Sequence, residues 1–278
     1  MGSRRIRTAP AFGSRRGGSG RILMALIVAA IALFSYYGSK EYNPITGEDQ
    51  YIALTPSQEI ALGLQAIPEM TQMHGGEYRN QDLQDYIDEV GFRIVDNSAA
   101  RDTEWQFEFT LLHDPKTVNA FALPGGPMFI TKALFDRLET EGQLAGVLGH
   151  EIGHVVARHS AQRIAKANLS QGLIEAVVVG SGDARSAQVA QMVGQMVNMK
   201  YGRDDELESD MLGVRFMVDA GYDPRALIDV MQILEDAAGG AAPPEFMSTH
   251  PNPGNRALQI ERAIAQLFPD GVPDGLIP

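Results

Sequence analysis

The sequence predicts an α+β fold, in which a mostly helical domain holds a small β-sheet beside one central helix and follows an N-terminal apolar helix. Apolar residues recur at helical spacing through most of the chain, whereas period-two alternation is confined to residues 105–131. An uncharged apolar run occupies residues 22–37. With 278 residues and 44% apolar content, the chain is long enough to bury a sizeable core.

Charged residues are unevenly distributed along the chain. Seven of the 23 basic residues lie in residues 1–40, which contain no acidic residue, so the remainder carries 16 basic against 35 acidic residues. Such an acidic body would repel phosphates, which argues against a nucleic acid partner. The absence of cysteine excludes disulfides, a thiol nucleophile and Cys-ligated zinc, but leaves the redox compartment open.

The N-terminus predicts a basic tail followed by a membrane anchor. Residues 1–20 are rich in Arg, Gly and Ser, and we expect a disordered cytoplasmic tail there. Residues 21–38 carry the apolar run, which as a helix would extend roughly 24 Å against a hydrocarbon core of about 30 Å. Six arginines precede the run, and they predict that the acidic body faces outward. A cleaved signal peptide is the alternative, although no small-x-small cleavage site follows the run.

Two amphipathic helices follow a polar linker predicted for residues 39–55. Thr55 opens a capping box with Pro at the first helical position, so a helix begins there, and Pro68 is expected to bend or end it. Apolar residues at helical spacing predict a second helix over Asn80–Asp96. His74 lies in a glycine-containing loop between them and is interpreted as a solvated residue without a role.

Three short extended segments are predicted next, at Trp105–Leu111, Asn119–Leu123 and Met128–Thr131. A Pro-Gly-Gly-Pro turn joins the last two. One interpretation is an ordinary β-meander beneath the helices. The other is an open sheet edge, with which an extended peptide pairs as an added strand.

The most informative motif is His150-Glu151-Ile152-Gly153-His154, in a helix that Thr140 caps and that includes Leu144–His159. One turn separates the two histidines, so both rings can bind one tetrahedral Zn²⁺, and Glu151 can act as general base on a water there. A chance match is the alternative, because the motif is short. Several glycines in this helix cost up to about 1 kcal/mol each, which predicts close approach of a neighbouring backbone or substrate.

We expect the third ligand to lie further along the chain than His159, the first histidine after the motif. His159 lies nine residues after His150, whereas a metzincin ligand would lie ten residues after it, at Ser160. The metzincin pattern therefore fails. We interpret His159 as a residue that supports a ligand or lies on the surface.

An acidic run opens a helix predicted for residues 203–217 and supplies better candidates. Glu206 can complete a His₂Glu site that leaves the fourth position to water. Asp210, one turn later, can accept the free ring N–H of a ligand histidine. Glu208 points away from both and is predicted to face solvent. The alternative is an acidic helix N-terminus that binds no metal.

Together, the motifs resemble those of gluzincin metallopeptidases, and within them the HtpX, LoiP and BepA-like group that includes the CAAX prenyl endopeptidases. The stretches that carry the resemblance are NAFALPGG, GHEIGHVVARHS, YGRDDELESD and STHPNPGNR. The resemblance implies a zincin-like peptidase domain over residues 56–278 that binds one Zn²⁺ per chain. It implies that the zinc ligands are His150, His154 and Glu206. It also implies that Glu151 is the catalytic base and that Asp210 is the carboxylate that orients a ligand histidine.

Further roles are implied by the resemblance alone. A substrate-aligning edge is expected at Asn119, Ala120, Phe121, Ala122 and Leu123. His250 and Arg256 would lie near the active site, with His250 as a candidate fourth ligand or oxyanion stabiliser. From the residues themselves, His250 is a turn residue ahead of a last helix at Arg256–Leu267. With one apolar span, the chain resembles the periplasmic members more than the multispanning ones.

Residues 169–202 leave two interpretations open. A Met-rich stripe within Gln188–Lys200 indicates core packing, or else a mobile plug over the zinc cleft. The apolar run Leu173–Val179 is too short to predict a second span.

We therefore expect a zinc metalloendopeptidase of the bacterial inner membrane that degrades misfolded or unassembled envelope proteins. Its catalytic domain would face the periplasm, either anchored or released by signal cleavage. Its partners would be protein or peptide substrates and the membrane, and the oligomeric state stays open. Two other classes remain: an envelope chaperone or assembly factor with an occluded zinc site, and a zinc-stabilised structural protein, which the intact Glu151 disfavours.

Overall fold

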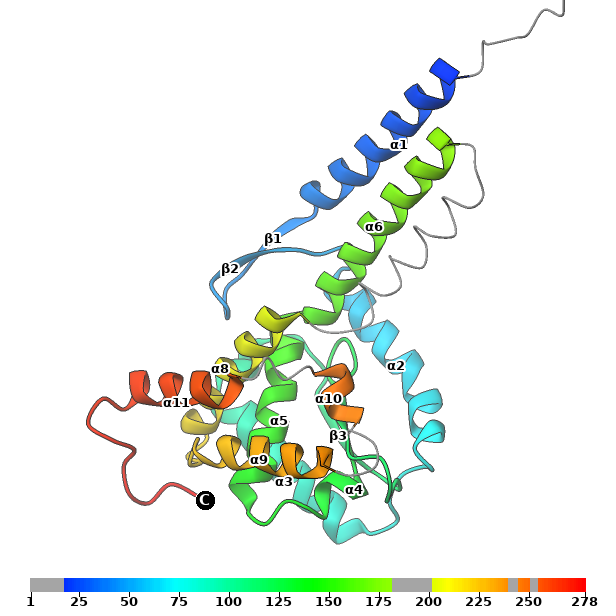
Figure 1. The fold of residues 1–278 in the computed structure, drawn as a ribbon. Helices are drawn as coiled ribbons and strands as arrows, with labels where there is room; N and C mark the ends of the chain where they lie inside the picture. Colours follow the sequence, from blue (N-terminus) through cyan, green and yellow to red (C-terminus); the bar gives the residue numbers. More distant parts are fainter. Residues whose placement is uncertain (1–17, 182–201, 240–244, 251–254) are drawn as a thin grey trace, which may run out of the picture.

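The computed structural model describes residues 18–181, 202–239, 245–250 and 255–278. Two long helices, α1 (Gly18–Gly38) and α6 (His159–Ser181), lie side by side and project from the rest of the molecule (Figure 1). Among the described residues, α1 is the one helix long and apolar enough to cross a membrane, and none of its apolar span is buried. The apolar helix predicted for residues 21–38 is therefore present.

The body of the molecule is mostly helical, and α5 lies at its centre. Every residue from Gly142 to Val156 in α5 is buried, and α3, α8 and α9 pack around it. The predicted α+β class is confirmed. The helices of the body are α2 (Pro56–Met73), α3 (Gln81–Asn97), the 3₁₀ helix η1 (Ala99–Asp102), α4 (Lys132–Phe135), α5 (Glu141–Val156), α8 (Arg203–Asp219), α9 (Ala226–Ala238), α10 (Glu245–Thr249) and α11 (Arg256–Leu267).

Glycines allow α8 to approach α5 closely. A Cβ added to Gly153 would lie 3.0 Å from the carbonyl oxygen of Ser209, and one added to Gly213 would lie 3.1 Å from the backbone nitrogen of His150. The expected reason for the glycines, close approach of a neighbouring backbone, is confirmed. This approach brings the histidines of α5 within reach of the acidic residues of α8.

The sheet beside α5 has the strand order β3 (Glu108–Leu112), β5 (Pro127–Thr131), β4 (Ala120–Ala122). β5 pairs in parallel with β3 and antiparallel with β4. The β-meander considered from the sequence is therefore wrong. All five residues of β5 are buried, so the most apolar strand takes the central place and the shorter β4 lies at an edge of the described sheet.

Residues 39–55 differ from the predicted linker, because they form a hairpin of β1 (Lys40–Asn43) and β2 (Glu48–Tyr51). Two buried polar side chains attach it to the end of α5: Asn43 donates to the Val156 carbonyl and Gln50 to the Ala157 carbonyl. The hairpin is attached by these hydrogen bonds and not by an apolar face. Its sequence is therefore polar, and for this reason it resembled that of a linker.

The predicted helix starts are largely confirmed. Thr55 forms the capping box of α2, but Pro68 does not end this helix, which continues to Met73. Asn80 caps α3 with its side chain, and Thr140 caps α5. The last helix, α11, has the predicted bounds.

His74 differs from its predicted solvated state. Its ring is buried, with Nδ1 3.0 Å from Asp114 Oδ2, and packs 5.4 Å from the Phe121 ring of β4. The pair arises because the loop before α3 folds back against the turn that follows β3. The Met-rich stripe and the plug predicted from it lie outside the described residues.

Candidate metal centre

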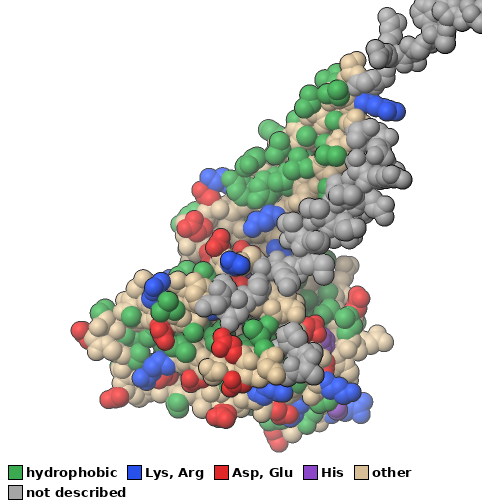
Figure 2. Space-filling view, viewed as in Figure 1, with side chains coloured by type: hydrophobic (Ala, Val, Ile, Leu, Met, Phe, Trp, Pro, Cys, Tyr) green, Lys and Arg blue, Asp and Glu red, His purple; other side chains and the backbone are tan. Residues whose placement is uncertain are grey.

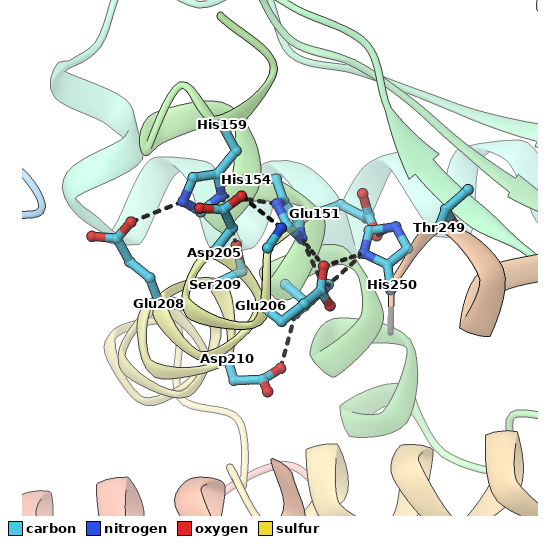
Figure 3. Close-up of polar contacts among 12 residues, drawn as sticks. Glu151, His154, His159, Asp205, Glu206, Glu208, Ser209, Asp210, Thr249 and His250 are labelled. Atoms are coloured by element: carbon cyan, nitrogen blue, oxygen red, sulfur yellow. Dashed lines mark hydrogen bonds and ion pairs between the residues drawn. The ribbon is translucent and has the colours of Figure 1, made fainter. Parts of the chain in front are cut away.

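Three helices bring four metal-binding side chains to one point. His150 and His154 extend from one face of α5, Glu206 from the first turn of α8, and His250 directly follows α10. One donor atom from each lies within 4.8 Å of all the others, and all four side chains are buried. Figure 3 labels His154, Glu206 and His250 of this group. The three ligands expected from the sequence are therefore together, with His250 beside them.

The distances among these donors match the edges of a tetrahedron around one zinc ion. Zn–N bonds of 2.0–2.1 Å at tetrahedral angles put neighbouring donors about 3.3 Å apart. The Nε2 atoms of His150 and His154 are 3.1 Å apart, and Glu206 Oε1 lies 3.5 Å from His154 Nε2. His250 Nδ1 lies 3.4 Å from His150 Nε2 and 3.2 Å from Glu206 Oε1. The residues present therefore fit a zinc ion.

The electrostatic environment favours the protonation states that bind a metal. Burial lowers the pKa of His154 well below its usual value, and the neighbouring His150 and His159 lower it further, so this ring is neutral at pH 7. Burial alone would raise the pKa of Glu206, but the hydrogen bond from His250 and the charge of Arg256 hold it below its usual value. Neutral imidazole and ionised carboxylate are the forms that ligate zinc.

Asp210 and Arg256 support His150. Asp210 Oδ1 lies 2.9 Å from His150 Nδ1, the ring nitrogen that faces away from the other donors. Arg256 donates to both carboxylate oxygens of Asp210, at 2.7 and 2.6 Å. Burial opposes ionisation of Asp210, but the guanidinium outweighs it and holds the pKa of this carboxyl below its usual value. Asp210 thus lies where its predicted orienting role requires.

Arg256 itself is buried and contacts a second carboxylate, with Nη1 3.1 Å from Glu206 Oε2. Its charge therefore lies against Glu206 and Asp210. Burial opposes its charge, but Asp210 and Glu206 raise the pKa of Arg256, so it stays a cation.

His154 is supported in another way, through His159, which agrees with the first of the two interpretations given to this residue. His159 is fully buried, with Nδ1 2.9 Å from His154 Nδ1 and Nε2 2.8 Å from Glu208 Oε2 (Figure 3). Ser209 Oγ lies 3.3 Å from the same His159 Nδ1. The prediction that Glu208 faces solvent is wrong, because the start of α6 covers this side of α8.

The available signal for this contact was the short connection after the motif. Arg158 adopts a left-handed backbone with φ 56°, so the chain turns sharply between α5 and α6. This turn carries His159 back beside His154. A helical wheel continued through residue 159 cannot find the contact, because it assumes that the helix goes on.

Glu151 is buried beside the donor cluster. Its Oε1 has no hydrogen-bond partner among the described residues and lies 3.6 Å from His250 Nε2. Since a buried carboxylate oxygen without a partner is costly, its position beside the donors indicates a function. This oxygen is available to accept a proton from a water molecule.

A small cavity borders His154. The cavity bordered by His154, Ala122, Leu123 and Ser160 has a volume of about 10 Å³. A single water molecule needs at least about that volume. This cavity therefore has room for about one water molecule beside His154.

The residues expected to align substrate lie along edge strand β4, which contacts α5. Thr131 donates its N–H to the Asn119 carbonyl, and Leu123 donates to the Pro127 carbonyl. In an antiparallel pair the direction of the backbone N–H and C=O groups alternates along the strand. The backbone groups of Phe121 therefore also point toward β5, whereas those of Ala120 and Ala122 point away from it.

Known proteins are similar to this chain over most of its length. Residues 79–264 match peptidase family M48. The beta-barrel assembly-enhancing protease of Escherichia coli K12 is 28% identical over 263 residues, covering 89% of this chain and 53% of that protein. A putative protein of the same name from Vibrio cholerae is 31% identical over 260 residues, covering 90% and 53%.

A mitochondrial relative also matches. The mitochondrial metalloendopeptidase OMA1 of Schizosaccharomyces pombe is 30% identical over 231 residues, covering 81% of this chain and 67% of that protein. The chain spans about half the length of the two bacterial relatives.

Proposed function

Because this chain belongs to peptidase family M48, whose members bind zinc and hydrolyse peptide bonds, we propose that it is a membrane-anchored endopeptidase for unfolded or unassembled proteins. The observation that carries the proposal is the convergence of His150, His154 and Glu206 on one point, with Glu151 buried beside them. A purely structural zinc site needs no general base in that position.

The reaction follows from the positions of the side chains. His150, His154 and Glu206 would hold the zinc ion, which when bound lowers the pKa of a water toward ~7 and polarises a carbonyl. Glu151 accepts the proton of the attacking water on Oε1 and passes it to the leaving amine. Arg256 acts through Asp210 and Glu206, so it is a positioning residue.

Edge strand β4 would align the substrate. An extended peptide that pairs with the backbone groups of Ala120 and Ala122 runs beside α5. Main-chain pairing tolerates many side chains, which suits an enzyme that acts on unfolded proteins. Phe121 stacks on Phe129 of β5, with ring centroids 5.1 Å apart, and keeps the strand rigid.

The location and the substrate class rest on α1 and on the relatives. α1 would anchor the protein in the bacterial inner membrane, and the arginines before it would keep the N-terminus in the cytoplasm and the body in the periplasm. The two bacterial relatives are named for the assembly of β-barrels. Unassembled envelope proteins are therefore the substrates that we infer.

Replacement of the general base tests this mechanism. The Glu151→Gln variant should bind one zinc ion per chain and lose casein hydrolysis by about 10²–10⁴-fold, the usual contribution of a positioned base. Metal analysis and casein digestion, with and without a chelator, measure both quantities. Glu261→Gln makes the same change on an exposed face of α11 and should leave both unchanged. Undiminished turnover in Glu151→Gln would remove Glu151 from the reaction.

A second candidate function, an assembly factor whose zinc site is occluded, is favoured by the position of His250. Its Nδ1 completes the donor tetrahedron, so in this conformation it occupies the position that a catalytic site leaves open. We propose that His250 is a fourth ligand that must move away before water and substrate enter, and not an oxyanion stabiliser.

The His250→Ala variant separates the two functions. If His250 closes a working protease, the variant should keep zinc and digest casein faster than the unaltered protein. If the protein is an assembly factor, neither form should cut. Thr249→Ala alters the neighbouring residue of α10 without touching the donors and should match the unaltered protein. Slower digestion by His250→Ala would instead support an oxyanion role.

A further inference from the structure

We propose that the apolar C-terminal part of α6, Leu173–Ser181, enters the lipid bilayer beside α1. The hydrocarbon of the bilayer is the partner of its exposed face. This inference rests on the proposed role of α1 as a membrane anchor and adds a second membrane element to it.

The register between the two helices is fixed at two levels. A Cβ added to Gly172 of α6 would lie 2.6 Å from the Ala32 Cβ of α1, and one added to Gly180 would lie 3.2 Å from the Ala25 Cβ. The helices therefore run antiparallel in close contact over these positions. Small residues that permit such approach are typical of helix pairs in membranes.

This register determines depth. The candidate span of α1 is Ser19–Gly38, which corresponds to about 30 Å of helix and to the thickness of the hydrocarbon core. Ala25 precedes Gly38 by 13 residues, or about 20 Å of helix. If α1 spans the bilayer, Gly180 therefore lies beyond the bilayer midplane, and Leu173–Ser181 has no position outside the hydrocarbon.

The composition of α6 changes at the depth that this register requires. Before Gly172, α6 carries polar residues such as Lys166, Asn168 and Gln171. After it, Leu173, Val177 and Val179 expose between 37% and 51% of their surface. These side chains continue the exposed apolar surface of α1, which Figure 2 shows along the projecting part of the molecule.

The one charged residue within Leu173–Ser181 is Glu175. Its side chain is exposed, accepts a hydrogen bond from Gln171 and borders a cavity between the two helices together with Val28 and Ala32. Ionisable residues in membranes usually face such cavities. Nearer the body, Tyr36 and Tyr37 of α1 cluster with Tyr51 of β2, which suits the aromatic belt of a membrane interface.

Depth-dependent quenching tests the proposal on the full chain in liposomes. The sequence has no cysteine, so single cysteines at Leu26, Val177 and Met211 can each carry one polarity-sensitive fluorophore. Met211 is an exposed residue of α8 in the body. With nitroxide groups on the lipid acyl chains, we expect fluorescence loss at Val177→Cys equal to that at Leu26→Cys, and no loss at Met211→Cys. Zinc content would verify that each variant is folded.

The outcomes separate the two proposals. Loss at Leu26→Cys without loss at Val177→Cys would overturn the entry of α6 and leave the anchor intact. A different result is that the fluorophore at Val177→Cys shifts its emission to shorter wavelength without being quenched by the lipid nitroxides. That result would mean that a second copy of the chain covers this face, and it would also overturn the entry of α6 into the bilayer. No loss at either position would overturn the anchor together with this inference. Adding Gly172→Leu to each cysteine variant should separate the two helices. Quenching at Val177→Cys should then decrease, whereas quenching at Leu26→Cys should stay unchanged.

Discussion

At the scale of single residues, the two histidines of the candidate metal centre are held by different chemistry. His150 faces Asp210, whose charge is fixed by Arg256. His154 faces another histidine, His159, whose second nitrogen contacts the half-buried Glu208. This arrangement can still fix the tautomer of His154. If His159 donates its Nε2–H to Glu208, its Nδ1 is free to accept the Nδ1–H of His154.

The contact between His159 and Glu208 should therefore contribute to metal affinity. We expect Glu208→Gln and His159→Phe to weaken zinc binding by about 10–100-fold, the usual effect of losing a group that orients a ligand. Competition with a chromophoric chelator measures the dissociation constant. Asp204→Asn removes an equal charge from an exposed position of the same helix and should have no effect. Equal affinities in all of these proteins would show that His154 needs no such support.

Another pair, the buried His74 with the partly buried Asp114, should control stability in acid. Burial alone would raise the pKa of Asp114, but the N–H groups of Thr117 and Lys116, together with His74, lower it to about 2. Because this value lies below the unfolded value of 3.8, the carboxylate stabilises the fold above pH ~4, and the contribution is lost as the pH falls toward ~2.

The variant Asp114→Asn should lose about 2 kcal/mol of unfolding free energy at pH 7, since one pKa unit corresponds to about 1.4 kcal/mol. In this variant, the unfolding free energy should also no longer show the decrease that Asp114 causes as the pH falls from ~4 to ~2. Urea unfolding of the zinc-free protein at several pH values measures both effects. Asp102→Asn, at an exposed site, is the matched control. A decline in acid as steep as that of the unaltered protein would assign the effect to other carboxylates.

At the scale of elements, the geometry of the centre depends on how closely α8 packs against α5. The contact of Gly153 with Ser209 lies between the histidines of α5 and the acidic residues of α8. Gly153→Ala should push α8 away by a few tenths of an ångström and displace Glu206. Lower zinc affinity with retained helix content, measured by chelator competition and circular dichroism, is expected.

Gly149→Ala provides the control for that change. Its Cβ would meet its nearest neighbour, the Gly213 carbonyl oxygen, at 3.4 Å, an ordinary contact. The added methyl group should keep zinc affinity and stabilise the helix by up to about 1 kcal/mol, as alanine does relative to glycine. If both variants bind zinc equally well, the spacing of α5 and α8 does not determine the site.

The same scale explains what the sequence could predict. The capping residues Thr55 and Thr140 and the bounds of α11 follow from local signals, because helical hydrogen bonds, and the side chains that cap the first free N–H groups, join residues only a few positions apart. The place of β5 between β3 and β4 does not, since pairing depends on segments far apart in the chain. For the same reason, the ligand residues could be predicted by spacing on two helices, whereas the contact of His159 with Glu208 could not.

At the scale of the whole molecule, the body and the projecting helices are joined at Arg158. Its guanidinium donates to Glu59 of α2 and Glu41 of β1, and it also binds the Leu54 carbonyl. These contacts link the end of α5, and hence the metal centre, to the hairpin at the base of α1. The core cluster of buried apolar residues contains no residue of α1. The core of the body is thus separate from α1, which packs on the hairpin through Tyr36 and Tyr37 against Tyr51.

A variant lacking residues 1–38 should therefore keep a folded body, although α6 loses its apolar partner and Tyr51 loses the rings of Tyr36 and Tyr37. We expect zinc binding and casein hydrolysis to persist, because the core cluster and the donors remain intact. The face of α6 around Gly172 and the buried Ala176 would become exposed. Since an uncovered apolar face drives association, the variant should form oligomers in buffer and become monomeric in mild detergent.

Size-exclusion chromatography with light scattering, with and without detergent, measures this association. Adding Val177→Asp to the truncated variant should reduce association, because a charge on this face opposes burial. A variant lacking only residues 1–17 keeps α1 and serves as the control. A truncated protein that is monodisperse without detergent would mean that α6 needs no apolar partner. Loss of zinc on truncation would mean that α1 supports the body, contrary to the separation of their cores.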